Sequence, residues 1–142
     1  MMRFISGASP IMILAMLALV IGRVEADGKK TPTIKEIMAK LNKPGGLHPT
    51  LATELKTDQP DWREIQKQAK EFVQYALDLA KNEPRKGDKE SWLRMTKAYA
   101  ENAKALEAAA RKKDAPAAKE AHARLGGTAC SACHKAHRPS MN

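Results

Sequence analysis

The chain has 142 residues, and its 25 Lys and Arg residues against 16 Asp and Glu residues give a formal net charge of +9 at pH 7. The 116 residues that follow the predicted N-terminal signal described below are expected to form one domain with a modest core and to leave no room for a second. The sequence has no nucleophile arrangement, paired carboxylates or phosphate-binding loop that would indicate an enzyme, and no recognition motif that would indicate nucleic-acid binding.

Residues 1–26 have the pattern of a secretory signal peptide. Arg3 gives a positive start, residues 11–21 form an apolar run, and Val24-Glu25-Ala26 fits a small-x-small cleavage site. The apolar run is short for a membrane span, and charged residues follow it at once. We predict cleavage after Ala26, export to the periplasm or another compartment outside the cytoplasm, and one mature domain over residues 27–142. Cleavage would remove two arginines and one glutamate, leaving a net charge of +8.

The first predicted helix runs from Thr33 to about Lys43. Thr33 and Glu36 fit a capping box, and the apolar residues that share one face of this helix are Ile34, Ile37, Met38 and Leu41. Pro44-Gly45-Gly46 ends the helix, and His48-Pro49 extends the irregular stretch. A short helical piece is predicted from Thr50 to Lys56.

Two long helices are predicted next, over residues 60–82 and 88–113. The first has a strict three-four spacing of residues on its inner face, which are Trp62, Ile65, Ala69, Phe72, Ala76 and Leu79. Asp88 is the expected N-cap of the second. Its expected inner face consists of Trp92, Met95, Tyr99, Asn102, Leu106 and Ala109.

Asp114 and Pro116 open the last predicted helix, which continues through Leu125 to the end of the chain, with a bend expected at Gly126-Gly127. No strand pattern occurs. Short connections between amphipathic helices predict an all-α fold, an antiparallel up-down-up-down four-helix bundle. In that topology the last helix ends beside the start of the first helix and the turn between the two long helices.

Both cysteines of the chain lie in Cys130-Ser131-Ala132-Cys133-His134, which is the C-x-x-C-H attachment sequence for a c-type haem. Residues i, i+3 and i+4 share a helix face, so two thiols and an imidazole can reach one flat ligand. Cys130 and Cys133 would form thioethers with the haem, and His134 would be the proximal ligand of the iron. We therefore expect one covalent haem c near the C-terminal end of the last helix.

C-x-x-C also occurs in zinc sites and in thiol redox pairs. A structural zinc would need a further ligand from His48, His122 or His137, none of which forms a paired motif. A thioredoxin-like dithiol begins a helix after a strand, and no βαβ pattern surrounds Cys130. Both alternatives fit the sequence less well than haem attachment, which also agrees with export.

Four helices with C-x-x-C-H near the C-terminus resemble the class II cytochromes c, the family of cytochromes c′ and c-556. The resemblance covers essentially the whole mature chain, and the ending fits that family's C-x-x-C-H-x-x-x-R, with Arg138 at the arginine position. Arg138 is a candidate for contact with a haem propionate, or a cation that complements the helix C-terminus. The break at residues 44–46 departs from the family's long first helix.

Within this family, a methionine on the first helix occurs in the low-spin c-556 type, whereas the c′ type leaves the iron five-coordinate and binds small gases. Met38 is similar in placement, so it is the candidate distal iron ligand; its alternative role is packing in the core. We expect His48 to be a solvated loop residue. His122 lies twelve residues before His134 and is expected to be exposed or packed against a helix.

Two functions follow from these expectations. The preferred one is one-electron transfer by a His134/Met38-ligated haem, and the alternative is binding of NO or CO at an open distal site. Basic residues expected at the haem-bearing end indicate an acidic redox partner protein. They are Lys29, Lys30, Lys35, Arg85, Lys86, Lys89, Lys135 and Arg138. A homodimer through an exposed helix face is also compatible with the sequence.

Overall fold

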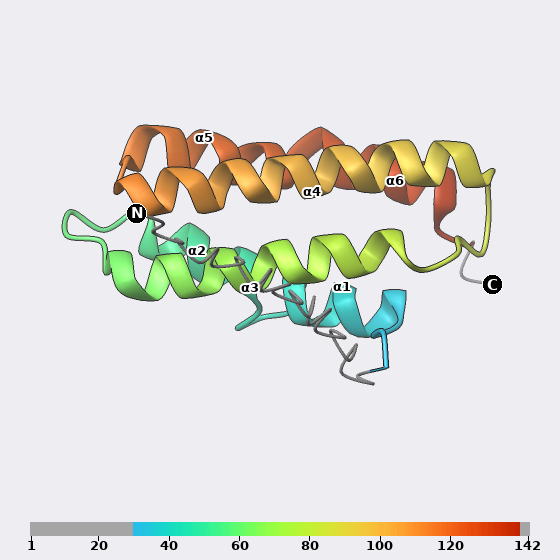
Figure 1. The fold of residues 1–142 in the computed structure, drawn as a ribbon, viewed down its shortest axis with the longest axis horizontal. Helices are drawn as coiled ribbons and strands as arrows, with labels where there is room; N and C mark the ends of the chain where they lie inside the picture. Colours follow the sequence, from blue (N-terminus) through green and yellow to red (C-terminus); the bar gives the residue numbers. More distant parts are fainter. Residues whose placement is uncertain (1–29, 140–142) are drawn as a thin grey trace, which may run out of the picture.

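The computed structural model describes residues 30–139, which form helices and contain no β-strand. The elements are α1 (Ile34–Asn42), α2 (Leu47–Glu54), α3 (Trp62–Ala80), α4 (Lys89–Lys112), α5 (Ala115–Leu125) and α6 (Gly127–His137). In Figure 1, α3 and α4 run side by side along the molecule, with α1 and α2 beside α3 and with α5 and α6 in succession along α4. The predicted all-helical fold class is confirmed, and the packing of the helices is compatible with a bundle.

The predicted signal peptide lies outside the described residues. Among the helices that the structure describes, none is both long and apolar enough to cross a membrane.

The first helix begins as its sequence predicts. The Thr33 hydroxyl accepts a hydrogen bond from the Glu36 amide at 3.3 Å, and the Glu36 carboxylate accepts one from the Thr33 amide at 2.8 Å. This reciprocal capping box satisfies two amides that the helix leaves unpaired. Ile37 and Leu41 are fully buried, which fixes the inner face of α1.

The second helix begins earlier than predicted. It starts at Leu47, so His48 and Pro49 lie in its first turn, where a proline is tolerated because the amide it lacks would have no helical partner. The prediction that residues 48–49 are irregular was therefore wrong. Gly46 is the N-cap, and a Cβ there would come within 2.9 Å of three backbone carbonyl oxygens, so only glycine fits this approach.

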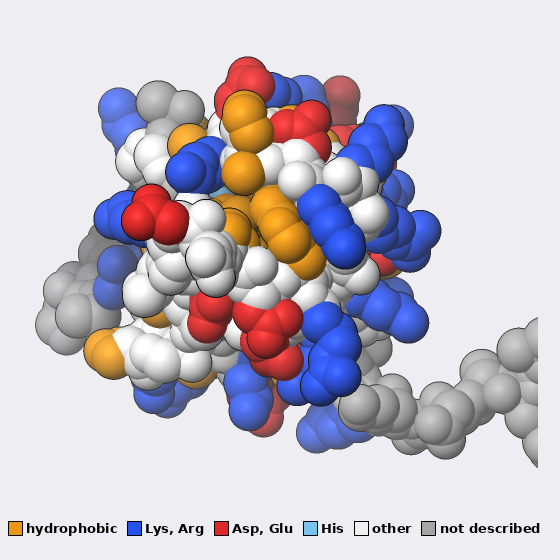
Figure 2. Space-filling model, turned by 90° about the vertical axis from the view of Figure 1, so that its left-hand side faces the viewer, with side chains coloured by type: hydrophobic (Ala, Val, Ile, Leu, Met, Phe, Trp, Pro, Cys, Tyr) orange, Lys and Arg blue, Asp and Glu red, His pale blue; other side chains and the backbone are white. Residues whose placement is uncertain are grey.

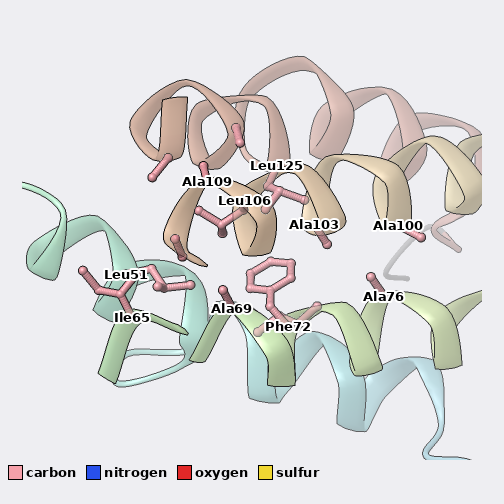
Figure 3. Packing of buried hydrophobic residues seen from close by; sticks show 14 of the residues in the cluster. Leu51, Ile65, Ala69, Phe72, Ala76, Ala100, Ala103, Leu106, Ala109 and Leu125 are labelled. Carbon is pink, nitrogen blue, oxygen red and sulfur yellow. The ribbon is translucent and has the colours of Figure 1, made fainter. Parts of the chain in front are cut away.

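The core lies mainly between α3 and α4. Phe72 is fully buried, and Figure 3 shows it reaching from α3 toward α4, with Leu106 and Leu125 close by. The predicted inner face of α3 is buried, apart from Trp62 at its start, but that of α4 is buried only at Trp92, Leu106 and Ala109. Met95, Tyr99 and Asn102 are only partly buried. The core positions of α4 are instead taken by small side chains, namely those of Thr96, Ala100, Ala103 and Ala110.

The expected bend in the last helix is confirmed, and it divides that helix in two. Gly126 ends α5, with its amide donating to the His122 carbonyl at 3.3 Å, and it is also the N-cap of α6. Gly127 has a φ of 43°, a backbone conformation that glycine adopts without strain. The direction of α6, and with it the C-x-x-C-H motif, is therefore set separately from α5.

The end of the molecule near α2 lies opposite the end at which α6 terminates. Figure 2 shows the end where α2 and the α4–α5 connection lie, with hydrophobic side chains in the middle and both acidic and basic side chains around them. The C-terminal part of α6 lies toward the other end, beside the connection between α3 and α4 (Figure 1).

Candidate haem-attachment site

Helix α6 carries the whole C-x-x-C-H motif. Cys130 and Cys133 are free thiols and are partly buried, and Cys133 packs against the hydrophobic core. The Cys130 thiol donates to the Leu125 carbonyl at 3.1 Å. His134, the next residue after Cys133, is exposed. The helix thus turns both thiols toward the protein and leaves the neighbouring imidazole accessible.

Tyr99 on α4 is close enough to both cysteines to interact with them electrostatically. Burial raises the pKa of Tyr99, and the Cys130 and Cys133 thiolates would raise it further. Burial also raises the pKa of Cys130 and of Cys133. The Tyr99 ring packs on Phe72, with ring centroids 5.9 Å apart. The sequence placed Tyr99 in the core of the bundle, and the structure packs it at the edge of the core, beside the cysteines.

His137 at the end of α6 is a residue for which the sequence indicated no role beyond that of a zinc ligand. Its side chain is only 5 % exposed. Its Nδ1 lies 2.9 Å from the Lys86 carbonyl oxygen, and its Nε2 lies 3.3 Å from the Ser91 hydroxyl. The signal that would have found it is its spacing of four residues from Cys133, which puts it on the face that the cysteines turn inward.

Met38 packs against the core from α1 and is partly buried. The Asn42 side-chain amide approaches its sulfur at 3.7 Å. Helix α1 contacts α2 and α3, whereas α6 contacts α4 and α5, and α1 and α6 do not contact each other. The structure therefore does not bring Met38 to His134 directly. Arg138 is the C-cap of α6, where its amide donates to the His134 carbonyl at 3.0 Å.

The structure brings His48 and His122 together, away from the motif. Their ring centroids are 4.1 Å apart, and the His122 Nε2 donates to the His48 carbonyl at 2.9 Å. Burial is the main cause that lowers the pKa of His48, and the nearby His122 lowers it further. The prediction that His48 is a solvated loop residue was wrong, and the expectation that His122 packs against a helix is confirmed because it is 9 % exposed.

The donor groups of α6 fit a covalently held haem. Two reduced thiols three residues apart lie on one side of a helix, and an accessible imidazole follows them directly. Sulfur and imidazole donors in this order are those of c-type haem attachment. Comparison with protein-family models, curated proteins and solved structures finds no match to this chain.

Proposed function

We propose that this protein is an exported monohaem c-type cytochrome of the class II type that carries out one-electron transfer. The observation that carries the proposal is the placement of the motif on α6, with both thiols partly buried beside Tyr99 and with the His134 imidazole exposed. A C-x-x-C-H sequence on a strand or loop would not hold the two thiols on one side of a helix with the imidazole in the same turn.

The residues of the motif have separate roles in this proposal. Cys130 and Cys133 hold the haem through thioether bonds, and His134 is the proximal ligand of the iron. Arg138, at the end of the same helix, is placed to contact a propionate. When bound, the haem supplies a ferrous/ferric couple, and a methionine ligand raises its reduction potential by favouring the ferrous form.

Met38 is the distal ligand in this proposal. It lies on α1, and α1 does not contact α6. A flat cofactor held between two helices requires that those helices stay apart, so this separation is compatible with ligation from the two sides. Apolar packing around Met38 would also exclude water from the distal side, which disfavours reactions with small oxygen species.

The proposed arrangement of the helices is up-down-up-down, with four helix ends meeting at the haem-bearing end. Two long-range contacts support it. The Asn82 side-chain amide donates to the Pro32 carbonyl at 3.1 Å, which joins the end of α3 to the start of α1. His137 joins the end of α6 to the turn that precedes α4.

We propose a periplasmic location and an acidic protein as the redox partner. Exposed basic side chains occur around the end of α6 and the α3–α4 turn. They belong to Arg85, Lys86, Lys89, Lys135 and Arg138. Of the other basic residues expected there, Lys29 lies outside the described part of the chain. Basic groups in this position would attract an acidic partner and speed encounter at low ionic strength. A homodimer stays compatible with the proposal.

The test is the ferric spectrum of the holoprotein made in a host that matures c-type cytochromes. Met38 ligation predicts a low-spin ferric spectrum with the weak long-wavelength charge-transfer band of methionine–iron coordination, and loss of that band in Met38→Ala. Met95→Ala is the matched control, because Met95 is also partly buried but lies on α4. A high-spin spectrum in the parent protein would instead establish the open, gas-binding form.

A further inference from the structure

We infer that His137 is a positioning residue: it anchors the end of α6 to the α3–α4 turn and so fixes where the preceding turn of the helix presents His134. The inference rests on the proposed function for what His134 does, but the anchor itself is argued from contacts within the protein.

The ring of His137 is held on several sides. The Lys86 carbonyl can only accept a hydrogen bond, so Nδ1 at 2.9 Å must carry the hydrogen. Nε2 lies 3.3 Å from the Ser91 hydroxyl, which can act as donor or acceptor. The Trp92 ring meets the imidazole edge-on, with centroids 5.4 Å apart, and the Trp92 indole donates to the Asn82 carbonyl at 2.8 Å.

The turn that receives this ring is shaped to fit it. Gly87 has a φ of 79°, a conformation that residues with a side chain rarely adopt. A Cβ at Gly87 would also lie 2.7 Å from His137 Nδ1 and 2.8 Å from the Ala136 carbonyl oxygen. The glycine is therefore required both for the turn and for the close approach of α6.

Besides His137, α6 is attached through Cys133, which packs against the hydrophobic core, and through the Cys130 thiol, which donates to the Leu125 carbonyl. The break at Gly126 separates it from α5, and its N-cap has no side-chain hydrogen bond. Among the α6 side chains that the structure describes, His137 is the one that is buried. Its removal would therefore loosen the rotation and position of a helix whose other end has no side-chain cap hydrogen bond.

His134 lies three residues before His137, so the two side chains share almost the same turn of α6. Fixing the His137 ring sets the rotation of the helix about its own axis at that level. The His134 side chain on the same turn then keeps one direction. An iron ligand needs a fixed direction because small changes in the orientation of its imidazole alter the reduction potential.

The test compares His137→Phe and Ser91→Ala with the parent holoprotein. His137→Phe keeps a ring against Trp92 and removes both hydrogen bonds, and Ser91→Ala removes one of them. We expect amide hydrogen exchange across residues 127–137 to accelerate at least about tenfold in His137→Phe and less in Ser91→Ala. We also expect the electron paramagnetic resonance signature of the ferric iron and the reduction potential to shift more in His137→Phe than in Ser91→Ala.

His122→Phe is the matched control. His122 is also buried and also donates to a backbone carbonyl at 2.9 Å, but it lies on α5 and contacts His48. We expect it to lower stability while leaving α6 exchange and the iron signature as in the parent. The inference is overturned if His137→Phe alters α6 exchange no more than His122→Phe does.

The two proposals fail separately. If the protein carries no covalent haem, the proposed function fails, while faster α6 exchange in His137→Phe would still support the anchor. If haem is bound but the exchange and the iron signature of Ser91→Ala and His137→Phe equal those of the parent, the anchor fails and the cytochrome proposal stands.

Discussion

His48 has a half-buried imidazole that the proposed electron transfer does not use. Its Nε2 has no hydrogen-bond partner and lies against Gly126, where a Cβ would be 3.1 Å away. Its neighbours are the uncharged ring of Phe72 and one titratable group, His122. A charged His48 would therefore be half-buried, with its Nε2 away from solvent and without a compensating anion, which makes the folded state disfavour its protonation.

This gives a prediction for the pH dependence of stability. Because the pKa of His48 is lowered from 6.5 in the folded state, the unfolded chain binds more protons as the pH falls through about 6.5. The contribution of a neutral His48 is fully present above that pH and is lost toward the lowered folded pKa. Between pH 7.5 and 5.5, the free energy of unfolding measured by urea denaturation should fall less in His48→Phe than in the parent. An equal fall in both proteins would contradict the role given to His48.

The histidines also show what sequence reasoning could not supply. The C-x-x-C-H residues could be proposed from the sequence because their chemistry is local to five positions. The contacts of His137 with Lys86 and of His122 with His48 join residues 51 and 74 positions apart. Such contacts depend on how the helices pack, and no local pattern distinguishes a buried histidine from a solvated one.

At the scale of the elements, helix N-termini were the most predictable features. Thr33, Asp88 and Asp114 cap α1, α4 and α5 as predicted, because a side chain that accepts from nearby amides acts over three residues or fewer. The start of α2 was missed because Gly46 gives no side-chain cap. Its role depends on the nearby backbone carbonyls of Lys40, Leu41 and Lys43, which a local pattern does not show.

The cap of α5 gives a second stability prediction. The Asp114 carboxylate accepts from the Ala117 amide at 3.0 Å, and α5 leads directly into the helix that carries the motif. Asp114→Ala should lower the free energy of unfolding by about 1 kcal/mol, measured by urea denaturation. Asp58→Ala is the matched control, because Asp58 is an exposed carboxylate between α2 and α3. A loss equal to that of the control would show that the cap is not stabilising.

The packing of α3 against α4 gives a third stability prediction. Phe72 is fully buried and contacts the rings of Tyr99 and His48. Phe72→Ala should lower the free energy of unfolding by about 3–5 kcal/mol, because surrounding alanines cannot move far enough to fill the space. Leu77→Ala on the same helix, at a side chain 38 % exposed, should cost much less. Similar losses in both variants would mean that the core lies elsewhere.

At the scale of the whole molecule, the all-helical class was predictable and the exact inner faces were not. Hydrophobic spacing identifies a helix, but α4 is rich in alanine, so several of its faces have similar hydropathy. The face that is buried combines Trp92 and Leu106 with small side chains, which hydropathy alone does not separate from the neighbouring faces. Tyr99 and Met95 were displaced toward the edge of the core, and Tyr99 thereby came to lie beside the cysteines.

The excess positive charge of the molecule should act on electron transfer mainly from the end where α6 terminates. Helix α4 has 24 residues, which corresponds to a length of about 36 Å, whereas electrostatic screening at 0.1 M ionic strength acts over about 10 Å. Under these conditions, charges at the α4–α5 end are screened from a small reactant that approaches the proposed haem edge.

Hexacyanoferrate and hexaammineruthenium ions are suitable reactants, because they are anionic and cationic redox probes of similar size. At 0.1 M ionic strength, Arg85→Glu combined with Lys135→Glu should slow the reaction of the holoprotein with hexacyanoferrate about two- to fivefold and speed that with hexaammineruthenium. Lys112→Glu combined with Lys119→Glu, at the far end, makes the same change in net charge and should alter both rates little. Stopped-flow rates that respond equally to the two charge reversals would place the site of electron transfer away from α6.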